Sequence, residues 1–196
     1  MGTAPFHYIT TIGSIEITVA PPEYPPFEID AIVEEQDTSL ILGVEPEIRY
    51  PGESYDSLVN HMYVQQPRSP GEIIVKKSCP LRFCAIVHDI EQKPTWKEEW
   101  VATALKKLLY EIGKYQVKTV VMPLLGTVYG SMSDESFIKL LCVALRTVQP
   151  GYPEKIWLDV HGRTNVAGTW KSRSDEFLIL QNRIRSFFEK YHASSP

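Results

Sequence analysis

The chain has 196 residues, of which 43% are hydrophobic and 22% charged, a composition that supports one folded core of ordinary size. Its net charge of −4 gives no overall attraction to nucleic acid or to an anionic membrane surface, which argues against both as partners. No window offers the roughly 18 uncharged apolar residues of a membrane-spanning helix, and the three cysteines show no disulfide framework. We therefore expect a single domain over residues 1–196, located inside the cell in the cytoplasm or the nucleus.

Short β-rich runs predict about eight strands along the chain. They cover residues 8–12, 15–19, 29–33, 40–42, 73–76, 85–90, 119–122 and 156–160. Residues 29–33, 85–87 and 117–122 are almost continuously apolar, which is typical of strands covered on both faces of a mixed or parallel sheet.

Amphipathic segments between and after these strands predict helices. Thr95 and Glu98 form a capping-box pattern, and apolar residues follow at helical spacing as far as Gly113. Ser133 and Ser174 are predicted to cap two further helices, and a weaker pattern covers residues 54–64. The order of elements predicts a three-layer α/β/α domain with a central mixed sheet, in which ligands bind beyond the carboxyl ends of the strands.

The segment from Val120 to Ser131 runs from an apolar strand into glycine and hydroxyl residues ahead of the helix that Ser133 begins. Gly126 and Gly130 can adopt positive φ, and such a turn before a helix can direct backbone N–H groups at an anion. The residues predicted to hold a phosphate are Gly126, Thr127, Val128, Tyr129, Gly130 and Ser131. The alternative is a tight connection between strand and helix that binds nothing.

Three segments, in this order and spacing, resemble the macro domain family over about residues 8–190. Residues 29–33 resemble the family's Val-Asp-Ala-Ile-Val strand, while residues 71–75 and 84–88 resemble its glycine-led strand and its Ile-Ile-His strand. The helix at residues 105–115 leads into residues 121–127, which are similar to the family's Gly-Thr-Gly phosphate loop. The resemblance implies a macro fold whose cleft binds ADP-ribose or a related nucleotide, without a further cofactor.

The resemblance also implies ligand contacts outside the glycine turn, among them an acid at the adenine and an aromatic ring stacked on it. The residues that correspond are Glu16, Asp30, Gln36, Gly43 and Trp170. Where the family has Asn-Ala-Ala-Asn, however, residues 34–37 read Glu-Glu-Gln-Asp. Because the asparagine is missing we expect binding without catalysis, and Asp37 is the candidate base if the chain is an ADP-ribosyl hydrolase.

A macro-fold interaction module that has lost the nucleotide pocket is the alternative function. The acidic residues between positions 34 and 47 would then engage a basic protein, whereas an intact cleft could accept an ADP-ribosylated one. The discriminating feature is whether these carboxylates project into the cleft, where they would repel phosphate, or turn away from it.

Four residues with possible metal-ligating side chains lie close in sequence: Cys79, Cys84, His88 and Asp89. They could form a metal site, or they could pack as ordinary core residues. The spacing contains no Cys-x-x-Cys pair. Cys84 and His88 are expected on one face of an apolar strand, as a packed thiol and a hydrogen-bonded histidine. We therefore predict no metal here.

Overall fold

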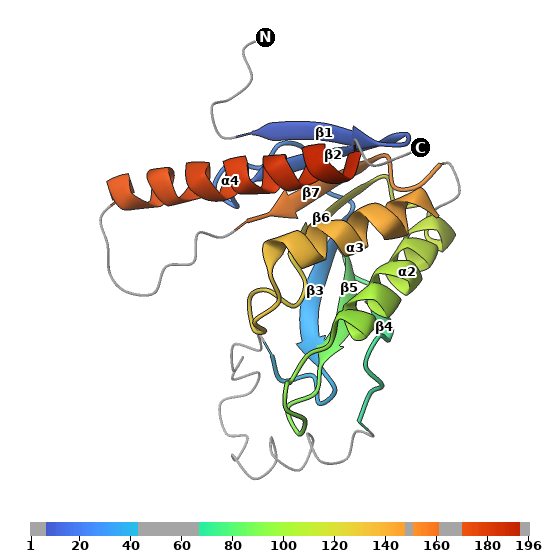
Figure 1. The fold of residues 1–196 in the computed structure, drawn as a ribbon. Coiled ribbons are helices and arrows are strands. Elements are labelled where there is room, and N and C mark those ends of the chain that lie inside the picture. The colour runs from blue at the N-terminus through green and yellow to red at the C-terminus, as the bar shows by residue number, and fades with distance from the viewer. Residues whose placement is uncertain (1–6, 43–66, 148–150, 161–169, 193–196) are drawn as a thin grey trace, which may run out of the picture.

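The computed structural model describes residues 7–42, 67–147, 151–160 and 170–192, with side chains omitted for residues 170–176 and 192. Seven strands form one sheet in the order β1-β2-β7-β6-β3-β5-β4 (Figure 1). They are β1 (Tyr8–Ile12), β2 (Ile15–Ala20), β3 (Ala31–Asp37), β4 (Ile73–Lys76), β5 (Leu81–His88), β6 (Thr119–Pro123) and β7 (Lys155–Asp159). The β1–β2 and β4–β5 pairs are antiparallel and the inner pairs are parallel, so the predicted mixed sheet is confirmed.

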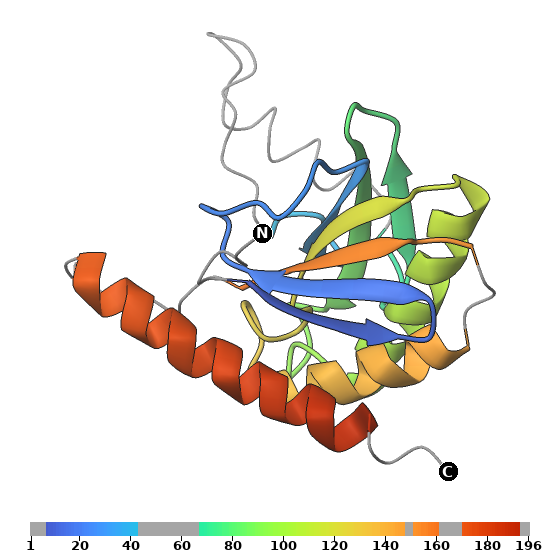
Figure 2. The same ribbon diagram turned by 90° about the horizontal axis from the view of Figure 1, so that it is seen from above.

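Three helices, α2 (Glu98–Lys114), α3 (Asp134–Arg146) and α4 (Trp170–His192), lie side by side on one face of the sheet (Figures 1 and 2). Helix α3 packs between the other two. The apolar stripes of α2 and α3 are buried against the sheet, as the periodicity predicted. On α4, Phe177, Ile184 and Phe188 are buried, but Leu178, which the spacing placed on the stripe, is 38% exposed. Each fully buried large apolar side chain stabilises the fold by roughly 1.5–3 kcal/mol. The Ser133 hydroxyl accepts the backbone N–H of Ser136 at 3.0 Å, which confirms the predicted cap of α3.

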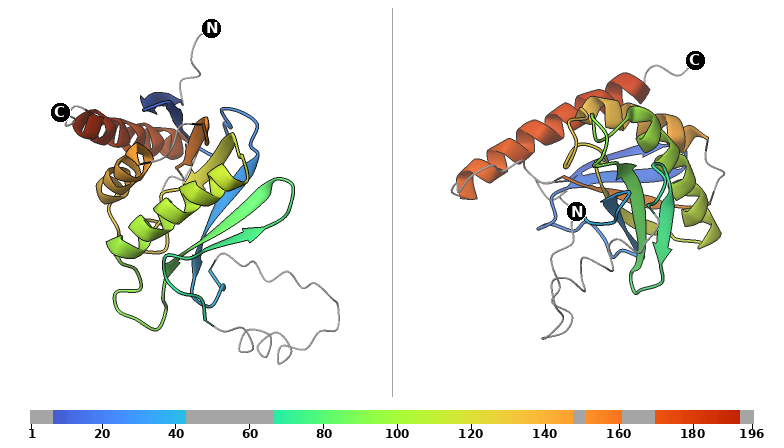
Figure 3. Two further views of the ribbon diagram at one scale, coloured as in Figure 1. Left: turned by 90° about the vertical axis from the view of Figure 1, so that its right-hand side faces the viewer. Right: turned by 90° about the horizontal axis from the view of Figure 1, so that it is seen from below.

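The opposite face of the sheet carries a smaller apolar cluster, built on Val121 and Trp157 from neighbouring strands. Phe27 and Ile29, from the connection between β2 and β3, pack against it. The indole Nε1 of Trp157 donates to the carbonyl oxygen of Ala20 at 2.9 Å, so its polar atom is satisfied where it is buried. Figure 3 shows this connection on the side of the sheet away from the three helices.

Some element boundaries differ from the sequence-based prediction. Residues 40–42 form a turn instead of a strand, because the Asp37 carboxylate accepts backbone N–H groups from this segment. Helix α2 begins at Glu98 with Lys97 as its N-cap, and the expected cap Thr95 instead accepts the N–H of Asp89 with its carbonyl. Helix α4 begins before the expected cap at Ser174. The weak helix predicted at residues 54–64 lies outside the described residues.

Strand β3 is the largest departure, since it runs through four polar residues that the prediction left outside the strand. It pairs with β6 over its first residues and with β5 along its whole length. Polar side chains are tolerated in this central strand because each has partners, as described below. Within the described residues no helix is long and apolar enough to cross a membrane.

Candidate functional site

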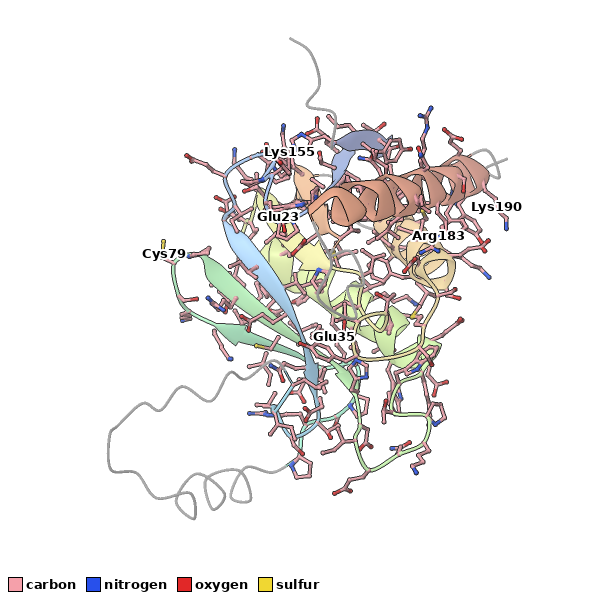
Figure 4. The ribbon with its side chains drawn as sticks, turned by 90° about the vertical axis from the view of Figure 1, so that its left-hand side faces the viewer. Glu23, Glu35, Cys79, Lys155, Arg183 and Lys190 are labelled. Atoms are coloured by element: carbon pink, nitrogen blue, oxygen red, sulfur yellow. The ribbon has the colours of Figure 1, made fainter. Side chains whose placement is uncertain are left out.

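The carboxyl ends of β3, β5 and β6 meet at one edge of the sheet, because these three strands are parallel neighbours. Residues 124–131, named here the Gly126 loop, connect the end of β6 to the start of α3 at this edge. Figure 4 shows Glu35 near the end of β3, where the connections that follow β5 and β6 come together. These elements form the candidate site.

Gly126 makes the turn of the loop with φ of +79°, as expected for a glycine there. The N–H of Thr127 donates to the Leu124 carbonyl at 3.1 Å and the Thr127 hydroxyl donates to the same oxygen at 2.7 Å. The Met132 N–H closes the loop on the Gly126 carbonyl at 3.1 Å. A side chain at position 126 would begin 3.0 Å from the sulfur of Met132, so the glycine is required by packing as well as by φ.

Gly130 is required by close approach and not by the positive φ that the sequence suggested. A Cβ there would lie 2.4 Å from the Gly126 carbonyl oxygen and 2.8 Å from Cδ1 of Trp96. The Trp96 indole Nε1 donates to the Ser131 hydroxyl oxygen at 3.1 Å. The segment between β5 and α2 therefore holds the far end of the Gly126 loop, a contact that the sequence analysis did not anticipate.

The outer part of the loop carries backbone donors without partners. Within the described part of the chain, the backbone N–H groups of residues 128–131 have no hydrogen-bond partner. The side chains of Val128 and Tyr129 are 57% and 50% exposed, so this stretch faces solvent. Consecutive unpaired N–H groups in a turn before a helix form a concave site for an anion.

Beneath the loop lies a buried pair of Glu35 and His88. Glu35 Oε1 contacts the imidazole Nε2 of His88, and both side chains are 2% exposed. Glu35 Oε2 accepts the Gly126 N–H at 3.1 Å, so one carboxylate joins strand β5 to the loop. The exposed ring of Tyr129 lies edge-on to the His88 ring, with centroids 6.4 Å apart.

A register shift in the sheet brings His88 to Glu35. Glu35 pairs with Ala85 and Gln36 with Ile86, but Asp37 pairs with His88 and skips one residue of β5. Without this shift His88 would face away from Glu35. The shift also corrects the expectation that Cys84 and His88 share a face, because Cys84 donates to Glu34 at 3.5 Å on the other side of β3.

Glu35 and His88 were both missed as site residues. The pattern of four polar residues ending a predicted core strand was the available signal, but it did not show which carboxylate turned inward. The two neighbouring glutamates differ in the structure. Glu34 pairs with Arg82, while Glu35 is buried.

Asp37, the candidate base, is fully buried and organises the following turn. One of its oxygens accepts the N–H of Ser39, and the other accepts those of Ile41 and Leu42 at 3.1 and 2.8 Å. Gln36 is buried too, and its Nε2 donates to the Leu42 carbonyl. Its Oε1 is buried and has no partner among the described residues.

Two predicted ligand contacts lie at the opposite edge of the sheet. Glu16, at the start of β2, forms an ion pair with Lys155 at 3.0 Å, and Figure 4 shows Lys155 at the end of the molecule away from Glu35. Asp30 precedes β3, and its Oδ2 accepts the N–H groups of Lys118 and Thr119 at 3.1 and 2.9 Å. The structure therefore does not bring Glu16 or Asp30 to the Gly126 loop.

The pKa of the Asp30 carboxyl reflects these contacts. Burial alone would raise this pKa, but the hydrogen bonds from Thr119 and Lys118 outweigh it and lower the pKa below the ordinary aspartate value. Of the remaining predicted contacts, Gly43 lies outside the described residues, and so does the side chain of Trp170 at the start of α4. Among the residues that the structure describes, no group of three metal-ligating side chains comes together.

Acidic residues in the first turn of α3 adjoin the loop, and bases of α4 neutralise them. Asp134 pairs with Arg183, and Glu135 pairs with Lys190 at 2.6 Å. Hydrogen bonds from Lys190 and Tyr191 lower the pKa of Glu135. The helix start therefore does not present unpaired negative charge to an approaching anion.

Comparison with known structures identifies the architecture. The macrodomain of Oceanobacillus iheyensis with ADP superposes with a TM-score of 0.63 at 12% sequence identity, over 94% of this chain and 97% of that one. A mutant of that macrodomain with ADPR gives 0.62 at 12% identity, over 93% and 99%. The macrodomain of Thermus aquaticus DarG gives 0.55 at 18% identity, over 75% and 99%. By sequence alone, no family profile and no curated protein matches.

The chain therefore has the macro fold, as the resemblance implied, and the described residues supply its mixed sheet and the layer of helices on one face. At identities this low the likeness concerns the fold.

Proposed function

We propose that this chain binds ADP-ribose or a related nucleoside diphosphate at the Gly126 loop. The observation that supports it is a run of backbone N–H groups at residues 128–131, which have no hydrogen-bond partner in the described part of the chain and lie in a stretch with exposed side chains. They precede α3, whose amino end adds a favourable dipole for an anion. Fold neighbours with ADP and ADPR support this choice of ligand.

The proposal is for binding without hydrolysis. Asp37 is fully buried and its carboxylate oxygens accept three backbone N–H groups, an arrangement that suits a structural residue better than a base acting on water. An interaction module for a basic partner finds less support in the described carboxylates. Glu34 pairs with Arg82, Glu35 with His88, and Asp37 with backbone N–H groups.

Calorimetric titration of ADP-ribose, with AMP and NAD as comparisons, tests the proposal. We expect a dissociation constant on the order of micromolar. Val128→Asp should raise it about tenfold or more, because a new carboxylate beside the loop repels the diphosphate. Val143→Asp is the matched control, since Val143 is a similarly exposed valine on α3, outside the loop.

Absence of binding by a folded sample would contradict the proposal. An equal loss of affinity in both variants would place the nucleotide somewhere other than the Gly126 loop. Either result would direct attention to protein partners.

A further inference from the structure

Glu35 differs from the other carboxylates of β3 because it contacts the candidate ligand loop itself. Its two oxygens are divided between two partners, with Oε1 on His88 and Oε2 on the Gly126 N–H. The Glu34 side chain lies on the opposite face of the strand, and the Asp37 carboxylate contacts the turn that follows β3. The Glu35 contact therefore ties the position of residue 126 to that of His88.

This contact acts at the residue where the loop turns. Gly126 has φ of +79°, and its carbonyl accepts the Met132 N–H that leads into α3. Its N–H would otherwise have to find another acceptor in a buried site, because Glu35 is itself buried below the loop. A hydrogen bond to a carboxylate is stronger than one to a neutral acceptor, so Glu35 favours this one loop conformation.

His88 keeps the carboxylate in place from the other side. The His88 carbonyl accepts the Thr38 N–H at 2.9 Å, and His88 forms an isolated antiparallel bridge with Trp96. Trp96 in turn contacts Gly130 and donates to Ser131. The loop is thus held at Gly126 by Glu35 and at residues 130–131 by Trp96, with the unpaired N–H groups between these two points.

We propose that Glu35 and His88 form a positioning pair that fixes the Gly126 loop in the conformation that accepts a diphosphate. The effect of this pair on ligand affinity rests on the proposed function. The pair does not touch the ligand. It acts through the Gly126 N–H, so residues 128–131 present their N–H groups in one arrangement before the ligand arrives.

The test combines a signal from the loop with a binding measurement on the full chain. The double variant Glu35→Met/His88→Leu replaces both partners by apolar side chains, which preserves the fold while removing the acceptor of the Gly126 N–H. We expect the Gly126 amide proton to move upfield in the NMR spectrum and to exchange with solvent at least tenfold faster. The dissociation constant for ADP-ribose should rise about tenfold.

Two single variants complete the design. Glu35→Gln keeps an oxygen acceptor for the Gly126 N–H and should retain slow exchange at Gly126 and most of the affinity. Glu34→Gln changes the adjacent carboxylate, whose partners lie on the other face of β3, and should leave both readouts as in the wild type.

The outcomes separate the two proposals. If the wild type does not bind ADP-ribose, the proposed function fails, and the Gly126 amide still reports whether Glu35 positions the loop. If the folded double variant keeps the wild-type Gly126 shift and exchange rate, the positioning role is overturned. Unchanged affinity in a variant whose Gly126 signal has moved would also overturn it.

Discussion

At both ends of strand β3 a carboxylate accepts backbone N–H groups, but one carboxylate is exposed and the other is buried. At the amino end, the exposed Asp30 carboxylate accepts the backbone N–H groups of Lys118 and Thr119 and joins β3 to β6. Near the carboxyl end, the buried Glu35 carboxylate accepts the N–H of Gly126 and also contacts His88. Water can replace the Asp30 contacts but cannot easily replace those of Glu35, so the second carboxylate needs its partner far more.

The largest effect is expected from breaking the buried pair. His88→Leu should lower the free energy of unfolding by about 3–5 kcal/mol, because it leaves the Glu35 carboxylate buried without its imidazole. Urea denaturation measures this loss. Adding Glu35→Met should recover most of it, whereas a double variant no more stable than His88→Leu would show that burial, and not the unpaired charge, sets the cost.

The close contact in the Gly126 loop should give the next largest effect. Gly130→Ala should lower the free energy of unfolding by about 1–3 kcal/mol, since the new Cβ would overlap the Gly126 carbonyl and Trp96. Gly113→Ala is the control, because a Cβ there meets nothing within 4 Å inside helix α2. Thermal melts of both variants should move in opposite directions, as alanine favours a helix interior over glycine.

A smaller effect is expected at the exposed end of β3. Asp30→Asn should cost about 1 kcal/mol at neutral pH, the usual worth of such hydrogen bonds. Because the pKa of Asp30 is lowered in the folded state, its stabilisation is complete above the ordinary aspartate pKa and is lost as pH falls through the lowered folded value. Denaturation of wild type and variant from neutral to acid pH should show the two stabilities converging. A constant difference would contradict this account.

The smallest effect is expected at Glu34, which lies between these two carboxylates. Glu34→Gln should change the free energy of unfolding by less than about 1 kcal/mol, because its partner Arg82 is largely exposed and screened by solvent. The change should shrink further in high salt, which a denaturation series at two ionic strengths would reveal. If Glu34→Gln lowered the free energy of unfolding as much as His88→Leu, the two faces of β3 would not differ in this way.

Sequence patterns predicted local structure correctly where a single residue determines the conformation of its own turn. Ser133 caps α3 because its hydroxyl reaches the Ser136 N–H within the same turn, and Gly126 takes positive φ because its neighbours in the chain form the turn. Residues 40–42 were assigned wrongly, since their apolar character favoured a strand while the side chain of Asp37 held them in a turn.

The sequence by itself determined the helical stripes, the apolar inner strands and the glycine turn before α3, because these depend on spacing along the chain. Only the tertiary structure decided that Glu35 meets His88, that Asp37 is enclosed and that Asp30 and Glu16 lie far from the loop. A shift of one residue in the β3–β5 register reverses which side chains share a face. That shift is a property of two paired strands, separated by more than 40 residues, and neither strand carries it alone.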